Sequence, residues 1–260
     1  MASLAYTTIA GRGRGVVTQR VLAAGANLVE CTPIAKVVKS APEGVQYCRH
    51  CLRPTQQRYC CPACADASTG WHFLERVDLS GLEAIHREQQ RKFPLLVAQV
   101  LSQLLSGLKA TGKPPDAWHD AMTLCHATLE PEAMPQVEAE HALLRDAFAD
   151  AGIANAATLD LLLPLPRYAQ LLGAAQLNAF ELQMSHGLVV SCLLPCEASF
   201  FNHSCQPKCA SRARHSNLAE RPVGTSPLAD TVAAAPPWLT MAARRDGGAA
   251  RSSRWARRTR

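Results

Sequence analysis

The sequence lacks the features that would assign it to a membrane or to a secreted protein. No stretch approaches the roughly 18 uninterrupted apolar residues that a membrane span requires. The opening segment, MASLAYTTIAGRGRG, does not have the basic region followed by an apolar region that defines a signal peptide. Internal repeats are absent as well. We therefore expect a chain that stays inside the cell, in the nucleus or the cytoplasm, with no membrane partner.

Acidic residues are scarce at the end of the chain and arginines are frequent there, so the net charge is unevenly distributed. Residues 211–260 contain ten arginines, no lysine and three acidic residues, which gives this segment a net charge of +7. The first 210 residues contain 17 basic and 18 acidic residues, a net charge of −1. A near-neutral body argues against a nucleic-acid-binding protein, and leaves the tail as the one segment suited to that role.

The tail, residues 211–260, is dominated by Ser, Ala, Pro, Gly and Arg and has no apolar period. Such a segment buries too little surface to offset its ordering entropy, so we expect it to be disordered. An arginine-rich tail can bind nucleic acid or direct a protein to the nucleus. The alternatives are a solvated tail or sequence read from a shifted frame or a retained intron. The scattered placement of the arginines favours these alternatives.

The chain of 260 residues is long enough for one large domain or two small ones. Its hydrophobic content of 48% is sufficient to build a core. Its first forty residues alternate short apolar runs with turn residues, which predicts strands and hairpins. The expected strands lie at 16–18, 28–31 and 37–38, with turns at 11–15 and 24–27.

A helical pattern begins at Asp78. One apolar stripe recurs at helical spacing and ends at Gly112 and Pro114. Further helices are expected around 137–150 and 166–180. The residues of the stripe are Val97, Val100, Leu101, Leu104, Leu105 and Leu108.

Four of the eleven cysteines form two closely spaced pairs, Cys48-x-x-Cys51 and Cys60-x-x-x-Cys64. In a reducing compartment such pairs are more typical of metal ligands than of disulfides. Zinc takes four tetrahedral ligands, and two thiolate pairs on turns can meet around one ion. Cys61 is an alternative to Cys60, because Cys61-x-x-Cys64 is also a common spacing. The pattern predicts one zinc ion, and four independent core thiols are the alternative.

The segment Ser199-Phe200-Phe201-Asn202-His203-Ser204-Cys205-Gln206-Pro207 resembles the Asn-His-Ser-Cys motif of SET-domain methyltransferases. Three further matches occur in the order that this family has. Gly13-Arg14-Gly15 is similar to the turn in the N-terminal half of a SET domain, and Leu177-Asn178-Ala179-Phe180 is similar to the segment that opens its second half. The cysteine pairs between them, with Tyr59 before Cys60, resemble a MYND finger.

The chain therefore resembles the SET-and-MYND family of protein-lysine methyltransferases. The resemblance implies an α+β fold, in which a split SET-type β fold is interrupted by a small zinc finger and a helical insert. It divides the chain into an N-terminal SET half at 1–43, a degenerate MYND-like finger at 44–76, a helical insert at 77–175, an incomplete C-terminal SET segment at 176–210 and the disordered tail at 211–260.

The finger departs from the MYND pattern in one respect. A full MYND finger interleaves two zinc sites, but here the middle cysteine pair and the closing His-x-x-x-Cys are missing. Trp71-His72 stands where the closing histidine would be, and Arg76 stands where its cysteine partner would follow. We expect His50 and His72 to be surface histidines and not ligands.

The resemblance also implies a binding site for S-adenosylmethionine. By analogy, Arg12, Gly13, Arg14 and Gly15 line the amino-acid moiety of the cofactor on a turn that its backbone can approach closely. Asn178, Asn202 and His203 then hold the cofactor by hydrogen bonds. The alternative for Asn202 and His203 is a polar turn between packed segments, and the glycines alone are common in flexible loops.

In this family a neutral lysine amine of a protein substrate, such as a histone, attacks the sulfonium methyl group while a tyrosine hydroxyl orients the amine. That tyrosine follows the Asn-His-Ser-Cys motif in a Gly-Glu-Glu…Tyr segment. Here no tyrosine follows His203, and no cysteine after Cys209 is present to share a metal with Cys205. Lys208 also replaces the usual Asn. We expect a related but inactive chain without catalytic residues of its own. The alternative is a non-enzymatic zinc-finger adaptor that binds a protein partner.

Overall fold

The computed structural model describes most of the first 201 residues and two later strands. The described residues fall into two compact units, which we treat separately. The sheet-and-finger unit draws on 4–32, 43–67 and 200–243, and the helical unit draws on 33–42 and 68–199. The ranges described are 4–11, 13–23, 26–68, 73–89, 93–184, 187–201, 209–213 and 239–243.

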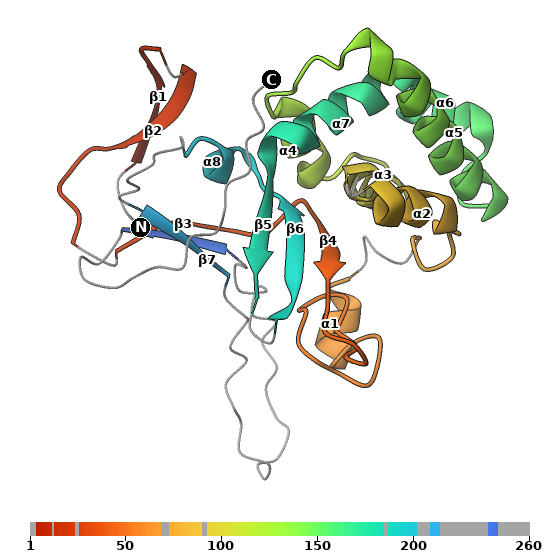
Figure 1. Ribbon diagram of the computed structural model, residues 1–260, viewed down its shortest axis with the longest axis horizontal. Coiled ribbons are helices and arrows are strands. Elements are labelled where there is room, and N and C mark those ends of the chain that lie inside the picture. Colours follow the sequence, from red (N-terminus) through yellow and green to blue (C-terminus); the bar gives the residue numbers. More distant parts are fainter. Residues whose placement is uncertain are drawn as a thin grey trace. The chain divides into compact units, whose positions relative to one another are not determined.

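Helices make up most of the helical unit (Figure 1). The predicted apolar stripe lies on α3, and the helices expected around 137–150 and 166–180 are α5 and α7. The bounds are α2 Ser80–Gln89, α3 Phe93–Thr111, α4 Asp116–Thr123, the 3-10 helix η2 Pro131–Ala133, α5 Met134–Asp150, α6 Ala156–Leu162, α7 Leu165–Asn178 and α8 Cys196–Ser199.

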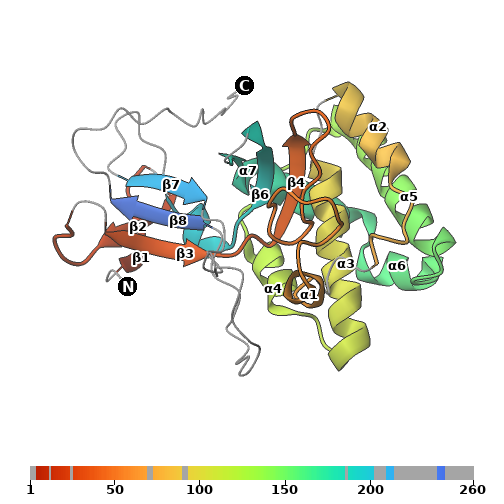
Figure 2. The same cartoon turned by 90° about the horizontal axis from the view of Figure 1, so that it is seen from below.

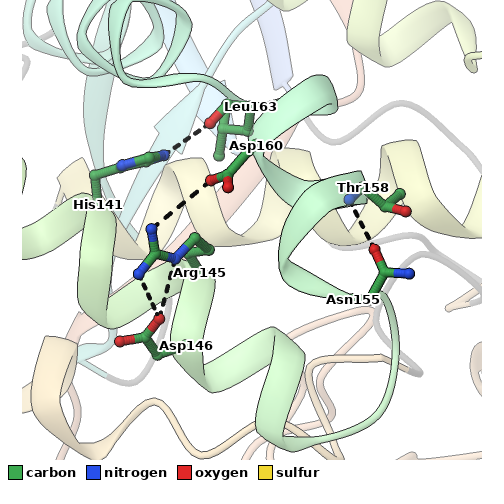
Figure 3. Close-up of polar contacts among 7 residues, drawn as sticks. All are labelled: His141, Arg145, Asp146, Asn155, Thr158, Asp160 and Leu163. Carbon is green, nitrogen blue, oxygen red and sulfur yellow. Dashed lines mark hydrogen bonds and ion pairs between the residues drawn. The ribbon is translucent and has the colours of Figure 1, made fainter.

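Local sequence signals explain where these helices begin and end. The Asp78 carboxylate accepts a hydrogen bond from the Ser80 amide at 2.9 Å, just where α2 starts. Asn155 caps α6 in the same way, accepting from the Thr158 amide at 2.8 Å (Figure 3). Gly112 follows α3 with a φ of +70°, a conformation that glycine adopts without strain.

Polar contacts also fix α5 against the end of α6. The His141 ring nitrogen Nε2 lies 2.7 Å from the carbonyl oxygen of Leu163. Arg145 points between two carboxylates, at 2.9 Å from Asp146 and 3.8 Å from Asp160 (Figure 3). These charges are partly exposed, so the ion pairs orient the helices more than they stabilise them.

The core of the helical unit is centred on α3. Val97, Val100, Leu101 and Leu104 are each about 1% exposed, which confirms the predicted stripe. Their neighbours Leu96 and Ala98 are fully buried as well, because α2, α4, α7 and the strand β4 pack around the helix. In the described part of the chain, α3 is the one helix long and apolar enough to cross a membrane, and most of it is buried as a core helix.

A three-stranded antiparallel sheet completes the helical unit. It is formed by β4 (Ala35–Ser40), β6 (Val189–Leu193) and β5 (Ala179–Gln183), in that order (Figure 1). Leu193 on the central strand pairs with Ala35 on one side and Ala179 on the other. Strands from the first forty residues and from the second half of the body therefore share one sheet across the finger and helical segments.

The sheet-and-finger unit contains two small sheets (Figure 2). The first is the hairpin of β1 (Leu4–Ile9) and β2 (Gly13–Thr18), in which Thr8 pairs with Arg14. The second has the order β3-β8-β7, where β3 is Asn27–Cys31, β7 is Cys209–Ala213 and β8 is Leu239–Ala243. The strands β2 and β3 cover those predicted at 16–18 and 28–31, but β2 begins at Gly13, inside the segment predicted to be a turn, and β1 was not predicted as a separate strand.

The strands β7 and β8 correct part of that prediction. Residues 211–213 and 239–243 belong to the segment expected to be disordered, yet they form ladders: Thr240 pairs with Glu30 on one side and with Arg212 on the other. The ladders join β8 to β3 and β7 to β8. The rest of 211–260 lies outside the described residues.

The arrangement is an α+β fold with small sheets, as predicted. The segment predicted as the N-terminal SET half contributes strands to both units. Its strands β1, β2 and β3 belong to the sheet-and-finger unit, and β4 belongs to the helical unit.

Candidate metal centre

The finger is a short antiparallel ribbon followed by one turn of helix. Tyr47 and Pro54 form a β-bridge, and the Cys48 amide donates to the carbonyl oxygen of Arg53 at 2.9 Å. The chain then returns past Arg58 and enters α1 (Pro62–Asp66). Pro62 suits the first turn of this helix, where its missing N–H has no intrahelical partner to lose. The ribbon presents Cys48 and Cys51, the segment leading into α1 presents Cys60, and α1 itself presents Cys64.

These four cysteines converge. Their sulfur atoms all lie within 4.8 Å of one another. The Cys60 sulfur is 3.4 Å from that of Cys51 and 3.5 Å from that of Cys64. A tetrahedron with zinc–sulfur distances of about 2.3 Å has sulfur atoms about 3.8 Å apart, so small shifts accommodate the ion. Among the described residues this is the one group of metal-ligand type that comes together, and it fits a four-thiolate centre.

The backbone of the first turn is strained at Leu52. This residue has a φ of +59°, the one positive value at a non-glycine residue in the described ranges, and its side chain is buried. A leucine adopts this conformation only where its surroundings impose it. The turn brings the Cys51 amide within 3.4 Å of the Cys48 sulfur, and the Leu52 amide donates to the carbonyl oxygen of Cys48. The strain thus accompanies a turn that brings the Cys51 amide close to the Cys48 sulfur.

The four thiols perturb one another's ionisation. Burial opposes ionisation of Cys48, but hydrogen bonds from the Cys51, Cys60 and His50 backbone outweigh it and lower the pKa to about 7. Desolvation of the Cys60 sulfur raises its pKa to about 12, although the residue as a whole is exposed, and the neighbouring Cys51 sulfur adds to this effect. Burial and the hydrogen bond with Cys60 also raise the pKa of Cys64. A divalent cation would displace the shared protons and stabilise all four thiolates.

Cys60, and not Cys61, completes the group. Cys61 is outside the converging set, although its sulfur is 4.0 Å from that of Cys60. Its carbonyl oxygen instead accepts the amides of Cys64 and Ala65 at the start of α1. The geometry supports the choice of Cys60 made from the spacing. His50 is not a member of the group either.

The residues expected at the cofactor site are only partly described. Arg12, Asn202, His203 and the Trp71-His72 pair lie outside the described residues. Gly13, Arg14 and Gly15 lie on β2, and the Arg14 guanidinium is 4.9 Å from the centre of the Phe200 ring. Tyr6 contacts the same ring edge-on, at 5.4 Å between centroids. The start of β2, a strand where the sequence predicted a turn, therefore lies near Phe200, which precedes the Asn-His-Ser-Cys motif in the chain.

Asn178 is the last residue of α7 and is buried in the helical unit. Its amide nitrogen donates to the carbonyl oxygens of Cys125 and Ala174, both at 2.7 Å. These bonds fix the connection between α7 and β5.

A hollow of ≈ 460 Å³ in the sheet-and-finger unit is lined by residues of the β2–β3 connection and of β3. None of the predicted cofactor residues lines it.

Two features of these sites had no signal in the sequence. A sequence indicates a positive φ where it has glycine or asparagine, and residue 52 is a leucine. The contact between Arg14 and Phe200 joins residues far apart in the chain.

No protein-family model matches the chain, and no curated protein matches it.

Proposed function

We propose that this chain is a zinc-stabilised relative of the SET-and-MYND protein-lysine methyltransferases that binds a protein partner and does not itself transfer methyl groups. The observation that carries the proposal is the convergence of Cys48, Cys51, Cys60 and Cys64. Four sulfur ligands leave no open position on a zinc ion, so the metal would crosslink the ribbon to α1 and would not act in catalysis.

Two further observations support the lineage. The sheet of β4, β6 and β5 joins strands from either side of the finger and helical segments, as expected of a β fold split by insertions. The Arg14 guanidinium, from the glycine-containing segment that would contact S-adenosylmethionine in such a protein, lies 4.9 Å from the ring of Phe200, two residues before Asn202 in the chain. The cofactor would supply an activated methyl group there.

The placement of the tyrosines supports the absence of methyl transfer. The chain has four, and each is described. Tyr168 is fully buried on α7 with its hydroxyl 3.4 Å from a Glu140 carboxylate oxygen, so it cannot meet a substrate. Tyr47 and Tyr59 belong to the finger, and Tyr6 lies on the β1–β2 hairpin. Residues 204–260 contain no tyrosine that could orient an incoming amine, and misplacement of about 1 Å can reduce a rate ~100-fold.

Transfer of a radiolabelled methyl group from S-adenosylmethionine to histones or to bulk cell protein tests this proposal. We expect no transfer by the 260-residue chain, and transfer when a Gly-Glu-Glu…Tyr continuation is added after residue 243, which keeps β7 and β8. Robust transfer by the chain itself that disappears in Asn202→Ala would contradict the proposed inactivity and would identify the cofactor site.

A pull-down addresses the binding function. The bait is the zinc-loaded chain, and the matched control is Cys48→Ser, which removes a buried ligand. A partner retained by the native chain and lost by Cys48→Ser supports a zinc-dependent adaptor. Partners retained equally by both would contradict a role for the finger.

A further inference from the structure

The metal centre is unevenly protected. Cys48, Cys51 and Cys64 are at most 5% exposed, whereas Cys60 is exposed. A fifth thiol, that of Cys61, is partly exposed and adjoins this open edge of the centre. Its sulfur lies 4.0 Å from that of Cys60, and it is not one of the converging ligands. One exposed ligand and one spare thiol therefore stand side by side.

We propose that the Cys60–Cys61 edge is an oxidation site at which a peroxide reversibly opens the metal centre. The inference rests on the proposed zinc site and adds a modification to it. Cys60 is the ligand that an oxidant reaches from solvent, and Cys61 is the thiol that can then react with it.

The reaction proceeds in two balanced steps. The Cys60 sulfur attacks one oxygen of hydrogen peroxide, the O–O bond breaks, and the products are a sulfenic acid and hydroxide. The Cys61 sulfur then attacks the Cys60 sulfur. The S–O bond breaks, and the leaving hydroxide takes the Cys61 thiol proton to form water. The two sulfurs lose two electrons in total to the peroxide, and Cys60 no longer ligates the metal.

Cys61 competes well with the two closer sulfurs of Cys51 and Cys64. Those sulfurs are metal ligands, so a disulfide with either would remove a second metal–sulfur bond. Attack by Cys61 removes no metal–sulfur bond other than the one that Cys60 has already lost. The centre keeps three thiolates, and this weakens the hold on the metal without abolishing the site.

The bond between Cys60 and Cys61 would also be easy to reverse. Adjacent residues have Cα atoms about 3.8 Å apart, shorter than the roughly 4.4–6.8 Å usual for disulfides. A strained disulfide of this kind is readily reduced by cellular thiols, which is typical of regulatory disulfides. The structure thus places a reversible bond next to a structural ion.

The test compares the full-length native chain with Cys61→Ser. Serine suits the position before α1, because it is a favoured residue at helix N-termini, and the fold should be preserved. Cys125→Ser, which alters an exposed cysteine of the helical unit, is the matched control. Zinc content is measured first in all three proteins, so that a missing metal site is recognised before any oxidation.

Each protein is then treated with hydrogen peroxide, followed by a thiol reductant, while a chromophoric chelator reports released zinc. The native chain and Cys125→Ser should release zinc, form a peptide lighter by two hydrogens with its crosslink at 60–61, and rebind zinc after reduction. Cys61→Ser should release zinc and fail to rebind it, because Cys60 proceeds to sulfinic acid. A crosslink from Cys60 to Cys51 or Cys64, or equal recovery in Cys61→Ser, would overturn the proposal.

Discussion

The side-chain amide of Gln99 forms hydrogen bonds with both the backbone N–H and the backbone carbonyl group of Lys36. The amide oxygen accepts the Lys36 N–H at 2.7 Å, and the amide nitrogen donates to the Lys36 carbonyl oxygen. Lys36 belongs to β4, an edge strand, so the glutamine from α3 makes the bonds that a further strand would make. Gln103 continues the pattern by donating to the Ile34 carbonyl oxygen. The core helix is thereby fixed to the sheet by polar as well as apolar contacts.

Replacement of Gln99 by alanine should destabilise the helical unit by roughly 2–6 kcal/mol. The substitution leaves two buried backbone groups without this partner, and each such group costs about 1–3 kcal/mol. Denaturant unfolding of the purified chain measures the change. Gln89→Ala, on an exposed position of α2, is the control and should change stability by less than about 0.5 kcal/mol. Equal effects of the two substitutions would show that the Gln99 contacts carry no stability.

The close approach of the Gly173 and Ala127 backbones leads to a second prediction. A Cβ atom on Gly173 of α7 would lie 2.3 Å from the carbonyl oxygen of Ala127. Gly173→Ala must therefore displace the loop that precedes η2, at a cost of about 1–3 kcal/mol or more. Thermal unfolding should show the loss.

Gly81→Ala is the matched control for Gly173. The atoms nearest to its Cβ would be side-chain carbons of Leu143, the first at 3.3 Å, and a side chain can move. Since alanine favours the helix, this variant should be neutral or stabilised by up to about 1 kcal/mol. The Ala127 amide donates to the Gly173 carbonyl oxygen, so its hydrogen exchange reports whether the loop has moved. A Gly173→Ala protein as stable as Gly81→Ala, with the Ala127 amide still protected, would contradict the close approach of the two segments.

The strand β8 makes a third prediction. It lies between β3 and β7, and Met241 pairs with Val29 and Ser211. Proline cannot donate to a ladder, so Met241→Pro should disrupt the sheet. Hydrogen exchange should then show loss of protection in β3. Met241→Ala keeps the backbone donor and should retain protection. Unchanged exchange in Met241→Pro would mean that β3 does not depend on β8.

The sequence predicts those parts of the molecule that depend on neighbours along the chain. The stripe of α3 follows from residues three and four apart, and the four converging cysteines fall within seventeen consecutive positions. Hydrophobic period and cysteine spacing are local signals, and both were sufficient here.

The remaining features depend on pairing between distant residues. The β8 sequence Leu-Thr-Met-Ala-Ala has no strong strand pattern, and its pairing with β3 spans about two hundred residues. The pairing of Gln99 with Lys36 spans 63 residues, and a glutamine on an apolar helix gives no indication of its partner. Such contacts are set by the packing of the whole fold, not by local propensity.

Two serine variants test the choice of ligand. Cys60→Ser should lose the zinc ion, because serine at neutral pH is a poor ligand and three thiolates hold the metal more weakly. Cys61→Ser should keep it, since Cys61 lies outside the converging group. Metal content after dialysis against a mild chelator distinguishes the variants. Retention by Cys60→Ser with loss by Cys61→Ser would transfer the ligand role to Cys61.

Metal analysis of the purified native chain is the most direct test of the account. The convergence of Cys48, Cys51, Cys60 and Cys64 predicts about one zinc ion per chain, bound by four sulfur atoms at about 2.3 Å in X-ray absorption. Two zinc ions per chain, no zinc, or a first shell containing nitrogen or oxygen would contradict the four-thiolate centre.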